Sequence, residues 1–301
     1  MAVGLSSDNA RVQRATDTYR RPSDHYENFP VASWLCPPAL RAPIAAIYWY
    51  ARTADDIADE GDAPAEQRLH GLAQYRDDLL RSVSGQGHSG RWPEVFDPLS
   101  RMVSLHGLPV PLLQDLLDAF CQDVAFTAQG LRYQTDGELL AYCRLSANPV
   151  GRLLLHLYRV TDSVALEQSD AVCTALQLIN FWQDLGRDIA RQRWYPSVQA
   201  MQQHGLTETA LRDGSNVHAA QRMVAAYAQS ARQLMLRGAP LARRIPGRSG
   251  WELRLVILGG LRVLEKMRAM DYATWRSRPR LGGGDAFLLV WRALSGQFAT
   301  P

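Results

Sequence analysis

Two groups of acidic residues stand out because each lies in, or directly after, an apolar stretch of the chain. The first contains Asp55 and Asp59, which follow the apolar run 44–51. On a helix this spacing of four places both carboxylates on one face, with Arg52 close to the same face. Like charges at this spacing destabilise an isolated helix, so we expect a cation beside them.

The second group is a polar stripe within a segment that is otherwise apolar. Asn180, Asp184 and Asp188 recur at every fourth residue, and Gln177 extends the stripe by one turn. The side chains of 176–182 are mostly apolar, which predicts a helix that is substantially buried. Burial of unpaired carboxylates is unfavourable, so this stripe also requires a cation.

Oxygen ligands of this kind suit Mg²⁺, which binds one or two carboxylates and completes its shell with water and substrate phosphate. Two such stripes facing each other across a cavity would hold a diphosphate through shared metal ions, with arginines neutralising the remaining charge. The alternative is purely structural, with rows of carboxylates salt-bridged to Arg187 and Arg191. The joint presence of both groups favours the metal site.

Helical periodicity dominates the chain and strand signals are scarce, which predicts an all-α protein. We expect a flexible N-terminal segment over 1–22 and one helical domain over 23–301. Pro149 should bend the helix that contains it, because proline removes a backbone hydrogen bond. The expected helices are 38–58, 65–83, 94–106, 111–127, 137–160, 170–191, 218–241, 251–272 and 286–294.

Composition excludes several classes of protein. The chain carries 33 basic and 30 acidic residues, a net charge of +3, which gives no general case for nucleic acid binding. No apolar run approaches the roughly 18 residues of a membrane span. The N-terminus lacks the apolar centre of a signal peptide, and the four cysteines form no CxxC pair. We therefore expect a cytoplasmic protein without a zinc site or a disulfide framework.

The two acidic motifs together resemble those of the squalene/phytoene synthase family of head-to-head prenyl synthases. The resemblance runs from His25 to about Arg292. Between the motifs, Tyr142-Cys143 and Val150-Gly151 match a helix that lines the family's reaction cavity. The residues that match the motifs are Tyr48, Arg52, Asp55, Asp56 and Asp59 in the first, and Gln177, Asn180, Asp184, Asp188, Arg193 and Tyr195 in and after the second.

This resemblance implies a class I isoprenoid synthase fold, a single helical bundle around a deep apolar cavity. It implies that Mg²⁺ ions at the polar mouth ionise a prenyl diphosphate. The implied metal ligands are Asp55, Asp59, Asn180, Asp184 and Asp188, of which Asp55, Asp59 and Asp184 are also assigned to catalysis. The implied substrate contacts are Arg52, Arg193 and Tyr195 at the diphosphate, Phe29 and Tyr48 near the reacting carbons, Tyr272 closing over the diphosphate, and Gln177.

Tyr142 matches a family tyrosine proposed to handle a proton, and packing of the cavity is its alternative role. Asn148, just before Pro149, is a candidate for holding a water molecule, because an amide both donates and accepts hydrogen bonds. Its alternative role is a hydrogen bond that caps the bend. Within the family, bulky Phe181 and Trp182 are among the variants that resemble the bacterial hopanoid-pathway branch.

That branch forms hydroxysqualene from presqualene diphosphate and water, which implies a carbon–oxygen lyase. A condensing prenyltransferase, making presqualene diphosphate, squalene or phytoene, is the first alternative. A non-catalytic helical assembly factor is the second. The expected partners are presqualene diphosphate and, through functional coupling, other enzymes of the squalene pathway, with no nucleic acid.

Peripheral contact with the inner face of the membrane is a further alternative, because the substrate and product are oily. Trp251, Leu255, Leu258 and the segment 286–291 are apolar enough to supply such a surface. The interpretation that we favour for them is core packing.

Overall fold

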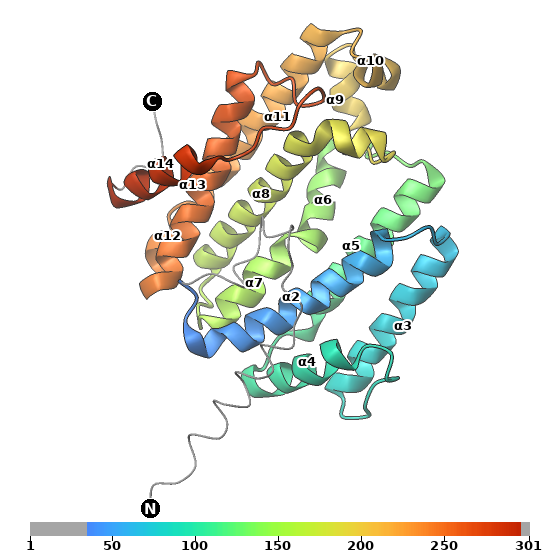
Figure 1. Ribbon diagram of the computed structural model, residues 1–301, viewed down its shortest axis with the longest axis vertical. Helices are drawn as coiled ribbons and strands as arrows, with labels where there is room; N and C mark the ends of the chain where they lie inside the picture. Colours follow the sequence, from blue (N-terminus) through green and yellow to red (C-terminus); the bar gives the residue numbers. More distant parts are fainter. Residues whose placement is uncertain (1–34, 296–301) are drawn as a thin grey trace, which may run out of the picture.

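The computed structural model describes residues 35–295, and within that range all regular structure is helical (Figure 1). This confirms the predicted all-α class. Phe29 and the expected boundary after residue 22 lie outside the described residues. The helices are α2 (Pro38–Asp59), α3 (Ala65–Val83), α4 (Pro93–His106), α5 (Val110–Gln129), α6 (Asp136–Ser146), α7 (Asn148–Leu157), α8 (Ser163–Ala190), α9 (Val198–Gln203), α10 (Glu208–Asp213), α11 (Val217–Gly238), α12 (Leu241–Arg244), α13 (Gly247–Ala269) and α14 (Gly283–Ser295).

Helix α8 forms the central axis of the bundle and carries the second acidic motif. Its 28 residues make it about 42 Å long. It begins where the Asp162 side chain accepts a hydrogen bond from the Ala165 amide, seven residues earlier than expected. It packs against α7, α11 and α13 (Figure 1). Trp182, fully buried in α8, stacks on Tyr227 of α11 with 3.9 Å between ring centroids.

Helix α2 presents the first acidic motif from a second core, shared with α3, α4 and α5. Tyr50 of α2 stacks on Tyr75 of α3 with 5.3 Å between ring centroids. Both hydroxyls are satisfied, since Tyr50 donates to the Leu113 carbonyl and Tyr75 to the Tyr50 carbonyl, each at 3.0 Å. Each buried aromatic ring of this kind stabilises the fold by roughly 2 kcal/mol. The end of α2 is therefore anchored firmly.

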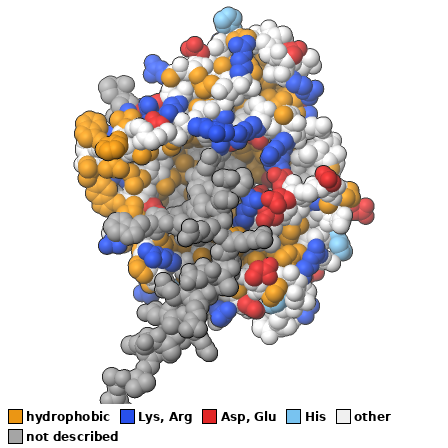
Figure 2. All heavy atoms as spheres, viewed as in Figure 1, with side chains coloured by type: hydrophobic (Ala, Val, Ile, Leu, Met, Phe, Trp, Pro, Cys, Tyr) orange, Lys and Arg blue, Asp and Glu red, His pale blue; other side chains and the backbone are white. Residues whose placement is uncertain are grey.

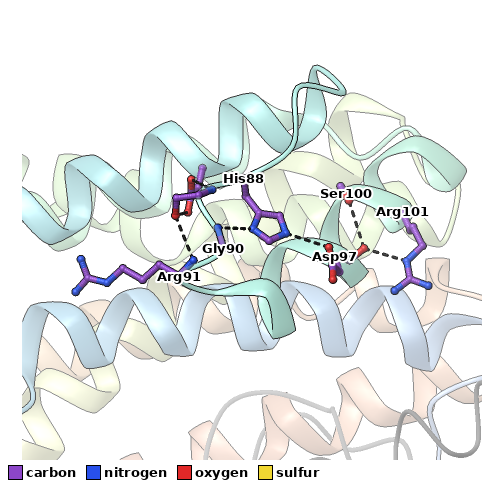
Figure 3. A network of polar contacts seen from close by, with 8 residues as sticks. His88, Gly90, Arg91, Asp97, Ser100 and Arg101 are labelled. Atoms are coloured by element: carbon purple, nitrogen blue, oxygen red, sulfur yellow. Dashed lines mark hydrogen bonds and ion pairs between the residues drawn. The ribbon is translucent and has the colours of Figure 1, made fainter.

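The loop between α3 and α4 is held by a small polar network (Figure 3). The Gly90 amide donates to Nδ1 of His88 at 3.1 Å, so Nε2 of His88 is the donor to Asp97, at 3.0 Å. The Ser89 hydroxyl donates to buried Asp78 at 2.6 Å. These contacts give the Gly/Ser-rich stretch between the two helices a defined conformation.

The expected helix over 137–160 is wrong in one respect, because the chain breaks at Ala147 into α6 and α7. Pro149 lies in the first turn of α7, where its missing N–H costs no helical hydrogen bond. A new helix therefore starts there, and no single helix bends. The short helices α9, α10 and α12 were not expected either, since four to six residues show too little periodicity.

The connection between α13 and α14, residues 270–282, packs on α8 at Gln183, Asp184 and Gly186. Asp271 and Tyr272 open it in the left-handed region, with φ of 51° and 57°. A Cβ on Gly186 of α8 would lie 2.4 Å from the Trp275 carbonyl oxygen, so only glycine allows this approach. Nε2 of Gln183 donates to the Pro279 carbonyl at 2.7 Å. The connection is thereby fixed on α8.

Among residues 35–295, no helix combines the length and the apolar character that a membrane span needs.

Candidate active site

The two acidic motifs line one pocket, with a cavity volume of about 1020 Å³, between α2, α5 and α8. Apolar and aromatic side chains of α5 and α8, among them Phe120, Val124 and Phe181, form part of its wall. The fold thus brings together motifs that lie more than a hundred residues apart. The predicted site residues that line this pocket are Arg52, Asp55, Asp59, Gln177, Asn180, Asp184, Asp188, Arg193 and Tyr195.

Arg52 supplies the cation that the first motif requires. Its guanidinium lies 3.0 Å from Asp55, 2.5 Å from Asp56 and 2.8 Å from Glu60. Burial raises the pKa of Asp56 to about 6, although Arg52 opposes that shift. Arg52 therefore gathers three carboxylates at the end of α2.

Asp59 is not held by Arg52 but by Arg193, which follows the second motif. The turn after α8 places Arg193 there: Gln192 has a φ of 62°, and the Arg193 amide donates to the Asp188 carbonyl at 2.8 Å. An ion pair thus joins the two motifs.

Asp184 is held by a residue that the sequence did not single out. Nε and Nη2 of Arg278 lie 2.6 Å and 3.0 Å from the two carboxylate oxygens, a bidentate pair. Arg187 lies farther from Asp184, at 3.7 Å, and Arg191 lines the pocket. The structural alternative, in which Arg187 and Arg191 pair with the carboxylate rows, thus holds in part: Arg187 reaches Asp184, but the bidentate partner of Asp184 is Arg278. The only sequence signal for Arg278 is the arginine-rich run after Tyr272.

The chemistry of these donors fits a divalent metal ion. Burial, together with neighbouring Asp184, raises the pKa of Asp188 to about 8. A cation would remove that repulsion. Within 35–295 no three His, Cys, Asp or Glu side chains converge closely enough to hold an ion alone. Mg²⁺ does not need such a cluster, because substrate phosphate and water complete its shell. Asp55, Asp59, Asn180, Asp184 and Asp188 supply only hard oxygen donors to the pocket.

A second residue missed by the sequence analysis is Asp123 of α5. Its side chain lines the pocket and accepts a hydrogen bond from the Tyr142 hydroxyl at 2.6 Å. Burial raises the pKa of Asp123 to about 7, although the Tyr142 hydrogen bond opposes that shift. Its signal was present in the sequence as a lone acid between Phe120 and Val124, both apolar.

Three predicted residues do not form the pocket wall. Tyr142 lies behind it, buried, and reaches the pocket through Asp123. Burial, and then Asp123, hold the pKa of Tyr142 well above 10. Tyr48 is buried in α2, and Tyr272 packs against the core around α8.

Asn148 makes a contact between two helices that the sequence analysis did not consider. It is buried, and its side-chain oxygen accepts a hydrogen bond from the Thr174 hydroxyl at 2.9 Å. It thereby ties α7 to α8 and is not part of the pocket wall.

Comparison with known proteins places these features in a family. A squalene/phytoene synthase family model matches residues 23–285, most of the chain. The chain belongs to this family. Its members are enzymes of the prenyltransferase type and generally depend on a divalent metal.

Curated relatives include the hydroxysqualene synthases of Zymomonas mobilis and Rhodopseudomonas palustris. Each is 40% identical to this chain, over 164 and 162 residues, which is 54% of this chain and 51% of the relative. The chain thus matches about half the length of these relatives. The phytoene synthase of Pseudescherichia vulneris is 25% identical over 94% of this chain and 90% of its own length.

Solved structures agree with this assignment of the fold. Squalene synthase HpnC from Alicyclobacillus acidocaldarius superposes with a TM-score of 0.74 at 31% identity, covering 88% of this chain and 95% of the other. A dehydrosqualene synthase superposes with a TM-score of 0.78 at 20% identity, covering 96% of each chain. The isoprenoid synthase helical fold implied by the motifs is confirmed.

Proposed function

We propose that this chain is a hydroxysqualene synthase. It would convert presqualene diphosphate and water into hydroxysqualene and diphosphate, in squalene and hopanoid biosynthesis, as a carbon–oxygen lyase. The observation that carries the proposal is the pocket in which Arg193 joins the two acidic motifs. The relatives named hydroxysqualene synthase, at 40% identity, favour this reaction over condensation; the presqualene diphosphate synthase of R. palustris is 28% identical.

Mg²⁺ held by Asp55, Asp59, Asn180, Asp184 and Asp188 would act as a Lewis acid on the leaving diphosphate. Several of these carboxylates are paired with arginines. With metal bound to the carboxylates, these guanidiniums would be available to phosphate oxygens, which arginine binds in bidentate geometry.

Loss of diphosphate breaks a carbon–oxygen bond, and the electron pair leaves with the phosphate. Phe181 and Tyr195, whose rings stack with 3.6 Å between their centroids, both line the pocket, where an aromatic π-system would favour a carbocation nearby. Water then adds to the rearranged cation and releases one proton. Asp123, whose pKa is near 7, is suited to accept it, and Tyr142 holds its carboxylate in place.

We propose a cytoplasmic enzyme, because an oily substrate and product favour peripheral contact with the inner face of a membrane and functional coupling with the other enzymes of the squalene pathway. A condensing activity is the second candidate, supported by the phytoene synthase match over almost the whole chain. The intact carboxylates of both motifs argue against a non-catalytic assembly factor.

Purified protein should be incubated with Mg²⁺ and either presqualene diphosphate or farnesyl diphosphate. We expect turnover of presqualene diphosphate, and its loss in Asp55→Ala and Asp184→Ala with the fold retained. Asp77→Ala, at an exposed position on α3, is the matched control and should stay active. Turnover of farnesyl diphosphate alone would overturn the proposal in favour of condensation. Failure of the Asp55 and Asp184 variants to fold would favour salt-bridged carboxylates with a structural role.

A further inference from the structure

Helix α14 carries a row of large apolar side chains that point away from the protein. Phe287 is 83% exposed, Val290 52%, Trp291 59% and Leu294 70%. Their spacing of three, one and three residues places them on one face of the helix. Figure 2 shows hydrophobic side chains gathered at the left edge of the molecule, where Figure 1 shows α14. The interpretation of 286–291 as core is therefore wrong for Phe287, Val290 and Trp291.

The opposite face of α14 is fixed on α13. At its start, Asp285 accepts from Arg262 and Lys266 at 2.7 Å and 2.6 Å. At its end, Nη1 of Arg254 donates to the Ala293 carbonyl at 2.8 Å. With both ends held, the helix cannot rotate to bury its apolar row. The exposed face is a stable feature of the fold.

Helix α13 extends this apolar surface. Trp251 is 43% exposed, and the guanidinium of Arg254 lies 5.1 Å from its ring centroid. Because the same guanidinium binds the Ala293 carbonyl, Trp251 lies near the end of α14. Leu258, by contrast, is buried as expected.

The segment of the chain that contains α12, α13 and α14 is strongly basic. Residues 241–295 carry eleven basic and four acidic side chains, a net charge of +7, against +3 for the whole chain. Exposed arginines of this region are Arg243, Arg244, Arg248, Arg268, Arg276 and Arg280. An amphipathic helix with an apolar face among arginines has the chemistry that recognises anionic lipid headgroups above acyl chains.

We propose that α14 and the arginines around it dock this protein onto an anionic membrane surface, with Phe287, Trp291 and Leu294 inserted between the lipids. A second copy of the chain fits this surface less well. A two-fold symmetric contact would bring the same basic surface against itself, and such contacts between like charges are unfavourable.

Docking would also bring the connection that leads into α14 toward the lipid. Arg278 of this connection, paired with Asp184 in the pocket, precedes the first residue of α14 by five positions. A prenyl substrate could then pass between the bilayer and the pocket along this connection. This functional consequence rests on the proposed function, whereas membrane docking itself does not.

The test is flotation of the full chain with vesicles of equal parts phosphatidylglycerol and phosphatidylcholine, and with vesicles of phosphatidylcholine alone. We expect binding to the anionic vesicles that weakens with salt. Phe287→Ser/Trp291→Ser should reduce it on the order of tenfold or more. Leu105→Ser is the matched control, because Leu105 is 72% exposed on α4, and it should bind as wild type does.

Three outcomes would overturn the proposal: no binding of the wild type to anionic vesicles, equal loss in the control variant, or a dimer in light scattering that the double variant dissociates. Turnover of presqualene diphosphate in detergent should be unchanged in the double variant. Loss of vesicle binding with intact turnover separates docking from the catalytic proposal. Leu294→Ser gives a second, milder variant that tests the same surface.

Discussion

The guanidinium of Arg278 binds the carboxylate of Asp184 through two contacts. Nε lies 2.6 Å from Oδ1, and Nη2 lies 3.0 Å from Oδ2. The two residues are 94 positions apart, and the connection between α13 and α14 brings them together. The second acidic motif is therefore completed by a segment outside both motifs. This makes Arg278 a candidate for binding the diphosphate once metal occupies the carboxylates.

Arg278→Gln should lower kcat/KM by about a hundredfold, because a charge-assisted pair of donors to the phosphate is lost. Arg278→Lys should not restore activity, since an ammonium cannot bind in bidentate geometry. Arg187→Gln is the control, because Arg187 is more exposed and lies 3.7 Å from Asp184. Steady-state kinetics and inhibition by inorganic diphosphate measure the effect. Unchanged inhibition by diphosphate in Arg278→Gln would exclude this role.

Asp123 should make stability depend on pH in the absence of metal. Its pKa is raised to about 7 in the folded protein, so its stabilising contribution is complete below its ordinary value near 4. That contribution is lost as pH rises through 7. The free energy of unfolding of wild type should therefore fall as pH rises from acid to pH 8, while that of Asp123→Asn should not. Relative to wild type, the variant should gain on the order of 1–3 kcal/mol over this range. Denaturant unfolding at several pH values measures this, and parallel pH profiles for the two proteins would contradict it.

Gly186→Ala should destabilise the protein by roughly 1–3 kcal/mol, because the new methyl group would meet the Trp275 carbonyl oxygen at 2.4 Å. It should also weaken the contact of Arg278 with Asp184. Gly259→Ala is the matched control in α13, where the nearest atom is 3.9 Å away on the Leu281 side chain. There alanine should be neutral or stabilising in a helix. Thermal unfolding compares the two, and equal effects would exclude close packing at Gly186.

The carboxylate of Asp285 should stabilise the contact between α13 and α14 only above acidic pH. Its pKa is well below the usual value because the Gly282 amide donates to it and because Lys266 and Arg262 lie against it. A lowered pKa stabilises the fold above the ordinary value and loses that effect as pH falls. Asp285→Asn should therefore lower the Tm at pH 7 and have a smaller effect near pH 3. A constant difference in Tm across this range would show that the charge is not responsible.

Much of the site could be predicted because its residues repeat along single helices. Asp184 and Asp188 share a face of α8 at helical spacing, and the apolar residues around them indicated burial. The partners were harder to find. Arg278 and Asp123 reach the pocket from other elements, and their position depends on tertiary packing that no local spacing encodes.

The surface of α14 shows a second limit on what can be predicted from the sequence. A run such as 286–291 is apolar whether it faces a core or an external partner, so periodicity alone cannot separate the two. Pro149 shows a third limit, since a proline that would bend one helix can equally start the next.

The most direct test of the proposed function is turnover of presqualene diphosphate in water enriched in oxygen-18, followed by mass spectrometry of the C30 product. The proposal predicts an alcohol that carries one labelled oxygen from water, formed with release of diphosphate and lost in Asp184→Ala. A hydrocarbon without oxygen, or no turnover unless farnesyl diphosphate is supplied, would contradict it.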